Sequence, residues 1–203
     1  MKIVLIVEGE TEKAFLPSLR AFLSRHLDRM PRLDIHPYDH RIPKEDELNR
    51  IVHNHLTGRN PADFVIALTD VYTGSQPLEF RDANDAKNKM REWVGNDPRF
   101  YPHAAQFEFE AWLLPYWTTI QRLAGHNRTA PAANPETVNH NNPPSRRIKA
   151  VFQSGRCRDS YLKTRDAGRI LRENDLSIAV NSCAELKALV NTIIQLCGGT
   201  AIP

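Results

Sequence analysis

The chain has 203 residues, of which 41% are hydrophobic and 25% are charged, and its formal net charge is +3. This length can bury the core of one domain, and the ordinary charged fraction excludes a disordered polyelectrolyte. The longest apolar run, Ile3–Val7, is too short for a membrane span, and we recognise no signal peptide. Three cysteines without a CxxC pair exclude a zinc knuckle and a disulfide framework, so we expect a cytoplasmic protein.

The first part of the chain alternates strands with helices. Lys2–Val7 is a continuous apolar run rich in β-branched residues, which is typical of a strand buried on both faces of a parallel sheet. A helix is predicted next, because apolar residues from Ala14 to Leu27 recur at helical spacing. A short strand is expected over Asp34–Tyr38. A second amphipathic helix follows over residues 44–57.

The middle of the chain continues this alternation. The buried strand 63–69 ends at Asp70, and the following residues up to 81 have a turn-like composition. A helix is predicted over 82–94 with Asp82 as its N-cap. A further strand is expected over 100–107. These elements together predict an α/β fold with a mostly parallel central sheet flanked by helices.

The last part of the chain is predicted to be helical. Residues 108–123 are apolar and aromatic, with a break or a new start at Pro115. Further helices are expected over 145–152, 164–174 and 182–197. We therefore divide the chain into an α/β core (1–124), a loop or insertion (125–145), and a basic helical extension packed on the core (146–203).

Positive charge is concentrated in this extension. Residues 146–172 carry a net charge of +7, so the rest of the chain sums to −4. The asymmetry favours an anionic partner, with nucleic acid first, and a solvated arginine-rich helical face is the alternative. The residues that we expect to contact nucleic acid are Arg146, Arg147, Lys149, Arg156, Arg158 and Arg165.

Acidic side chains follow three of the predicted strands. Glu8 comes after the first strand, Asp70 ends the third, and Glu108 and Glu110 follow the fourth. Because functional groups gather at the carboxyl ends of parallel strands, we expect these acids at one edge of the sheet. Glu12 follows Glu8 by four residues, so an early helix start turns it toward the same place.

Carboxylates brought together repel one another unless a cation neutralises them. An all-oxygen set suits Mg²⁺ or Mn²⁺, and such a site supports phosphoryl transfer with metal-activated water. We therefore predict a metal site made of Glu8, Asp70, Glu108 and Glu110. The alternative is that the acids within residues 8–12 only stabilise the start of a helix.

Several motifs carry a family resemblance. Val7–Glu12 reads VEGETE and resembles the start of the Toprim domains in the overcoming-lysogenization-defect nucleases. The chain is more closely similar to the DUF4276 family, a Toprim-like group of bacterial proteins. The other matching segments run in order along the chain and are Thr69–Tyr72, Gln106–Leu114, Pro144–Ile148, and Tyr161–Lys163 with Gly168.

The resemblance implies a Toprim-like fold and metal-dependent cleavage of nucleic acid. Carried over by position, the resemblance implies that Glu8 is a metal ligand or general base and that Glu12 is the second acid of an ExxxE pattern. It implies that Asp70 is the main metal ligand and that Glu110, with Glu108 beside it, is the later acid. Lys163 matches a cation that stabilises charge on the scissile phosphate. One position departs from the usual Asp-x-Asp pattern, because Tyr72 stands where a second acid is expected. One hard metal ligand is therefore missing there.

The expected function is a Mg²⁺- or Mn²⁺-dependent nuclease that hydrolyses phosphodiester bonds in DNA or RNA, in phage defence or DNA processing. The resemblance implies an ABC-type ATPase subunit as a partner, and a homodimer stays open. The alternative is a non-catalytic, Toprim-like subunit that binds or senses nucleic acid, and Tyr72 motivates it. A primase-like nucleotidyl transferase ranks below both.

Overall fold

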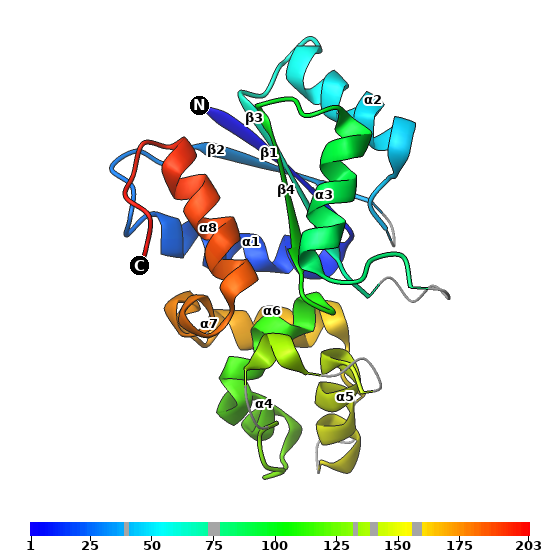
Figure 1. The fold of residues 1–203 in the computed structure, drawn as a ribbon. Helices are drawn as coiled ribbons and strands as arrows, with labels where there is room; N and C mark the ends of the chain where they lie inside the picture. The colour runs from blue at the N-terminus through cyan, green and yellow to red at the C-terminus, as the bar shows by residue number, and fades with distance from the viewer. Residues whose placement is uncertain (39–40, 73–77, 132–133, 139–141, 156–159) are drawn as a thin grey trace.

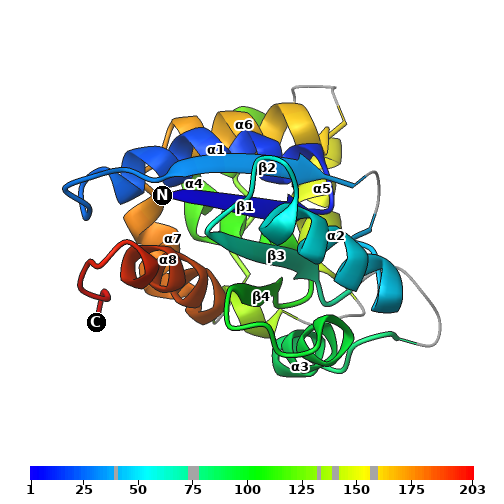
Figure 2. The ribbon, with the colours of Figure 1, turned by 90° about the horizontal axis from the view of Figure 1, so that it is seen from above.

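The computed structural model describes residues 1–38, 41–72, 78–131, 134–138, 142–155 and 160–203. Its centre is a sheet of four parallel strands in the order β2-β1-β3-β4, which Figures 1 and 2 show side by side. The strands are β1 (Lys2–Val7), β2 (Arg32–Pro37), β3 (Phe64–Asp70) and β4 (Phe100–Ala105). The predicted α/β fold with a parallel sheet is therefore confirmed. The chain runs from β1 to β2 on one side of it and then crosses to β3 on its other side, so the strand order reverses between β1 and β3, where ligands of such sheets commonly bind at the carboxyl ends.

Both faces of the sheet are buried. Alternate residues of β1 enter two different core clusters, with Ile3 and Leu5 in one and Val4 and Ile6 in the other. The first cluster lies under α1 (Glu10–Leu23) and α8 (Ala184–Leu196), and the second under α2 (Glu45–Thr57) and α3 (Ala83–Val94). This two-sided burial explains why β1 reads as a continuous apolar run rather than an alternating one.

The remaining helices lie beyond the carboxyl ends of the strands, below the sheet in Figure 1. They are the 3₁₀ helix η1 (Phe109–Tyr116), α4 (Trp117–Ala124), the 3₁₀ helix η2 (Pro135–Thr137), α5 (Pro144–Ser154), α6 (Lys163–Arg172) and α7 (Leu176–Ser182). The first core cluster draws side chains from α1 and from α5 to α8 alike. The division of the chain at residues 125 and 146 stays a prediction.

The structure changes some of the predicted bounds and confirms others. The strand predicted to residue 107 ends at Ala105, because Phe107 has a left-handed backbone (φ 69°) that cannot continue a strand. The predicted helical segment 108–123 is a 3₁₀ helix to Tyr116 and an α-helix from Trp117, which confirms the break or new start expected at Pro115. The short helix α7 lies before α8 and was not predicted.

The segment predicted as a loop or insertion is partly packed against the core. Glu136 in η2 is buried, and its carboxylate accepts hydrogen bonds from Trp112 Nε1 (3.1 Å) and from the backbone N–H of Glu185 (3.1 Å). These bonds tie the segment to η1 and to the start of α8. Within the described residues, no helix is long and apolar enough to cross a membrane.

Candidate metal centre

Glu8 and Asp70 meet where β1 and β3 end. Val7 pairs with Leu68, so the next residues, Glu8 and Thr69, are also neighbours. Glu8 Oε1 accepts hydrogen bonds from Thr69 Oγ1 (2.5 Å) and from the backbone N–H of Asp70 (3.1 Å). No described residue donates to Glu8 Oε2. One oxygen of Glu8 is thus fixed by β3, and the other is left for a ligand.

Asp70 has the same one-sided hydrogen bonding. Its Oδ1 accepts from the backbone N–H of Phe109 (2.8 Å), and none of the residues described in the structure donates to Oδ2. The left-handed turn at Phe107 makes this bond possible, because it bends the chain back over the end of β3. The backbone N–H of Tyr72 donates to the Phe107 carbonyl (2.7 Å) and holds the turn in place. A bulky residue at positive φ is costly, and such strain gathers at functional sites.

Glu12 lies in the first turn of α1, as its spacing from Glu8 predicted. Its carboxylate is buried and accepts a hydrogen bond from the backbone N–H of Gly9 (3.1 Å) at Oε2. This bond belongs to a capping box, so Glu12 also stabilises the helix start. The helix-start role that was held as the alternative therefore applies to Glu12, in addition to its place beside Glu8.

Glu110 pairs with Lys163 at the other flank of the edge. Its side chain is 1% exposed, and Lys163 Nζ lies 3.1 Å from its Oε1. The hydroxyl of Tyr161 donates to the same oxygen at 3.5 Å. The Lys163 side chain is 52% exposed, so its ammonium is held by Glu110 and still faces solvent.

Glu108 has a different environment from the other acids. Both of its oxygens accept hydrogen bonds from Ser145, one from the backbone N–H and one from Oγ, each at 2.9 Å. Ser145 lies in the first turn of α5, so Glu108 caps this helix. The structure thus places Glu108 at the acidic edge but gives it a bonded structural partner.

Burial dominates the electrostatics of the edge. It raises the pKa of Glu8 to about 7, against the hydrogen bonds from Thr69 and Asp70. Burial and repulsion from Glu8 and Glu12 raise the pKa of Asp70 well above its usual value. Burial opposes the charged form of Lys163, but the carboxylates around it, Glu110 foremost, outweigh this and raise its pKa. Negative charge at this edge is therefore only partly compensated by the protein.

The donor set fits a hard divalent cation in its chemistry. Glu8, Glu12, Asp70 and Glu110 supply carboxylate oxygens, the ligands that Mg²⁺ and Mn²⁺ prefer. Among the described residues, however, no three Asp, Glu, His or Cys side chains are close enough together to enclose an ion. The acids are thus neighbours at one edge without forming a closed cage.

The predicted nucleic-acid-binding residues are spread over α5 and α6. Arg146 and Lys149 are exposed on α5, and the Nε of Arg147 donates to the Asn142 carbonyl (3.0 Å). Arg165 is engaged with the buried Asp166, at 2.8 Å from its Nε. Part of the positive charge of α6 therefore stabilises a buried acid. Two further predicted residues, Arg156 and Arg158, lie outside the described residues.

Sequence reasoning did not assign a role to three residues that shape this edge. Thr69 holds Glu8, Ser145 holds Glu108, and Tyr161 contacts Glu110. Each lies within two residues of a predicted site or binding residue. That proximity is the signal that could have pointed to them.

The order of the parallel strands and the acids at their carboxyl edge define a Toprim-like α/β domain. The chain belongs to the DUF4276 family, described as a domain of unknown function, whose model matches residues 7–194. The family expected from the motifs is thereby confirmed. No curated protein matches the chain.

Solved structures resemble this fold over nearly its full length. The C-terminal region of the Burkholderia pseudomallei OLD protein is 14% identical, with 96% of this chain and 98% of that chain covered and a TM-score of 0.51. The C-terminal region of the Xanthomonas campestris pv. campestris OLD protein is 12% identical, with 97% and 95% covered and a TM-score of 0.46. The Burkholderia structure shows that the two chains share a fold.

Proposed function

We propose that the protein is a nuclease that hydrolyses phosphodiester bonds in DNA or RNA with Mg²⁺ or Mn²⁺. The observation that carries the proposal is the pair Glu8 and Asp70. Each is fixed through one oxygen by the protein and keeps a second oxygen to which no described residue donates. Partly buried carboxylates in this state favour a divalent cation as their partner.

The ion would be held by Asp70 and Glu8, and Glu12 and Glu110 lie at the same edge without closing a cage around it. When bound, a divalent metal supplies charge neutralisation at a phosphate and a water of lowered pKa. In the metal-free protein burial raises the pKa of Glu8 to about 7, so Glu8 is suited to accept a proton if it acts as the general base rather than as a ligand of the ion. Phe109 keeps Asp70 oriented through its backbone N–H.

Lys163 is suited to stabilise negative charge on the scissile phosphate. Glu110 orients its ammonium, while about half of the Lys163 side chain stays exposed to solvent. An ammonium has three N–H donors, so the bond to Glu110 leaves donors for a phosphoryl oxygen. A cation fixed in advance at this place stabilises the transition state without reorganising.

The exposed basic residues of α5 would hold the nucleic-acid backbone. Arg146 and Lys149 lie one helical turn apart on this helix. Glu108 caps α5 through Ser145, and this joins the helix rigidly to the acidic edge. Arg147, Arg156, Arg158 and Arg165 remain further proposed contacts to phosphate.

A second candidate function is a non-catalytic subunit that binds or senses nucleic acid. Tyr72 favours it, because a phenol replaces a second hard ligand after β3. In either case we propose a cytoplasmic protein with an ABC-type ATPase partner, in phage defence or DNA processing. A homodimer is a further candidate assembly.

Cleavage assays test the proposal. Plasmid, single-stranded DNA and tRNA would be incubated with wild-type protein and Mg²⁺ or Mn²⁺, with and without the ATPase encoded beside its gene. We expect cleavage that requires the metal and that Asp70→Ala abolishes. If wild type cleaves no more than Asp70→Ala under every condition, the nuclease proposal fails. Salt-sensitive DNA binding without metal binding would then favour the binding subunit.

A further inference from the structure

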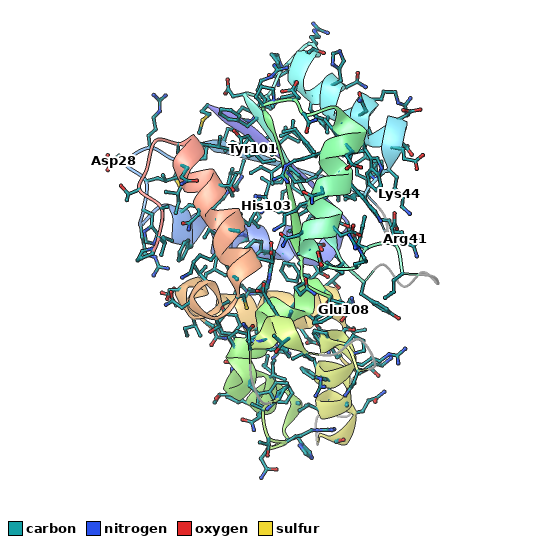
Figure 3. The ribbon with its side chains drawn as sticks, viewed as in Figure 1. Asp28, Arg41, Lys44, Tyr101, His103 and Glu108 are labelled. Atoms are coloured by element: carbon teal, nitrogen blue, oxygen red, sulfur yellow. The ribbon has the colours of Figure 1, made fainter. Side chains whose placement is uncertain are left out.

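A second group of cations flanks Glu8 on the face of the sheet away from Lys163. Arg41 and Lys44 come from the connection between β2 and α2, and Figure 3 shows both at the flank of the sheet above Glu108. They line a water-sized cavity of about 10 Å³ together with Glu8, Thr69 and Glu79. Burial raises the pKa of Glu8, and the charge of Arg41 opposes this rise. The acidic edge therefore has cations on both sides.

The two flanks belong to different layers of the molecule. Ile42 and Phe80, which also line this cavity, are part of the core cluster under α2 and α3. Tyr161, which contacts Glu110 beside Lys163, is part of the cluster under α1. Glu8 and Asp70 thus lie between Lys44 on one side and Lys163 on the other.

Glu79 holds Lys44 in a defined place. Its Oε1 lies 2.6 Å from Lys44 Nζ, and its side chain is only 14% exposed. The carbonyl of Glu79 accepts from Lys89 Nζ (2.6 Å), whose ammonium also lies over the Phe80 ring. The other carboxylate oxygen of Glu79 is buried and has no hydrogen-bond partner in the described structure. Glu79 is therefore fixed at its backbone and directs its charge at Lys44.

Lys44 remains accessible although it is paired. Its side chain is 43% exposed, and its ammonium has three donors of which Glu79 uses one. An ion pair of this kind orients a lysine toward solvent and leaves donors for an incoming anion. The same arrangement, a buried glutamate with a half-exposed lysine, occurs at Glu110 and Lys163.

Backbone strain gives a second reason to single out this segment. Three described residues other than glycine have positive φ, namely Glu45 (46°), Asn96 (59°) and Phe107 (69°). Asn96 follows the helix-capping Gly95, where this conformation is common. The other two lie next to Lys44 and next to Glu108. Strained residues persist where a functional geometry is held, and Glu45 and Phe107 place such strain beside Lys44 and beside the acidic edge.

We infer that Lys44 is a substrate-binding residue that contacts a backbone phosphate beside the scissile one, with Glu79 as its positioning residue. The inference rests on the proposed function, because it assumes that nucleic acid crosses the acidic edge. The strand then passes from the Lys163 flank to the Lys44 flank, with phosphates held on both sides of the carboxylates. This contact is separate from the predicted basic residues 146–165.

The test measures how binding depends on salt. A fluorescein-labelled single-stranded oligonucleotide would be titrated with the full chain and Ca²⁺ at several salt concentrations, with anisotropy as the readout. For Lys44→Gln we expect five- to tenfold weaker binding at low salt. We also expect the slope of log K against log salt to fall by about 0.7, the loss of one phosphate contact on a single strand. Lys44→Arg keeps the charge and should restore the slope.

Lys2→Gln is the matched control. Lys2 lies at the opposite end of β1 and is also paired with a carboxylate, 3.8 Å from Asp34. Its variant should keep the wild-type slope. Glu79→Gln should weaken binding less than Lys44→Gln, because the cation stays but loses its orientation, and this variant keeps the test informative if Lys44→Gln fails to fold.

The outcomes separate the two proposals. If wild type binds or cleaves nucleic acid and the slope of Lys44→Gln equals that of Lys2→Gln, the role of Lys44 is overturned and the proposed function stands. If wild type neither binds nor cleaves any nucleic acid, both are overturned. A reduced slope in Lys44→Gln alone supports the inference.

Discussion

Two sets of carboxylates in this protein differ in their burial and in how the protein bonds them. Asp166 is 0% exposed, and its two oxygens accept from Arg165 Nε (2.8 Å) and the backbone N–H of Leu162 (2.8 Å). Glu136 accepts from Trp112 and from the start of α8. Glu8 and Asp70, in contrast, each keep one oxygen without a donor among the described residues.

The comparison separates acids that stabilise the folded state from acids that lower its stability. A buried acid that is fully hydrogen-bonded supports the fold, whereas neighbouring acids whose charges repel one another weaken it. The acids of the first kind join α6 and η2 to the core. The acids of the second kind gather at the carboxyl edge of the sheet, where a ligand can stabilise them.

Replacing an acid of the second kind should affect activity most. Asp70→Asn removes the charge and keeps the shape, so we expect loss of metal-dependent cleavage by a factor of about a thousand or more, on the order of 4 kcal/mol in the barrier. The melting temperature should stay the same or rise, because the substitution removes a partly buried charge that neighbouring acids repel. Cleavage kinetics and thermal unfolding measure the two effects. A lower melting temperature with cleavage retained would contradict this account.

Replacing an acid of the first kind should affect folding instead. Asp166→Asn leaves Arg165 and Arg169 without their buried partner. We expect the free energy of unfolding to fall by about 1 to 3 kcal/mol, because the hydrogen bonds of a buried carboxylate are weakened while both arginines stay partly exposed to solvent. Urea denaturation checks this. An unchanged unfolding midpoint would show that Asp166 is not the stabilising acid that its bonds indicate.

The metal-free protein should become less stable as the pH rises. Glu8 holds its proton up to a pH of about 7 in the folded state, whereas an ordinary glutamate loses it near 4.5. Between these values unfolding releases a proton from Glu8, so the contribution of Glu8 to stability is highest below pH 4.5 and falls toward pH 7, by at most about 3 kcal/mol. Unfolding midpoints of wild type and Glu8→Gln in a chelator, from pH 4.5 to 8, test this. Glu8→Gln should show a flatter decline, and parallel curves for the two proteins would argue against it.

The smallest effect is expected at the position that departs from the Toprim pattern. Tyr72→Asp adds a hard oxygen ligand directly after β3, so Mn²⁺ should bind about three- to tenfold more tightly. Calorimetry measures the change, with Tyr72→Phe as the control that adds no ligand. Equal affinities for Tyr72→Asp and Tyr72→Phe would place residue 72 away from the ion.

The placement of Glu8 and Asp70 could be predicted because it depends on local pattern. Each acid ends a continuous apolar run, and parallel strands bring such ends to one edge. Glu12 followed from its four-residue spacing on α1. These inferences need only the period of the hydrophobic residues and the rule for parallel sheets.

Other features depend on contacts between distant segments. The capping of α5 by Glu108 involves Ser145, 37 residues away, and no local pattern contains it. Glu136 is buried because Trp112 and Glu185 surround it, although its segment reads as a polar loop. The ammonium of Lys44 is held beside the acidic edge by Glu79, which comes from a distant segment of the chain. Tertiary packing, rather than local preference, decides these positions.

Calorimetric titration with Mn²⁺ tests the central claim most directly. Wild type, Asp70→Asn and Glu136→Gln would be compared at pH 8 after removal of metal by a chelator. The account predicts saturable binding to wild type, its loss in Asp70→Asn and its retention in Glu136→Gln. Absence of binding to wild type, or equal binding to wild type and Asp70→Asn, would contradict it.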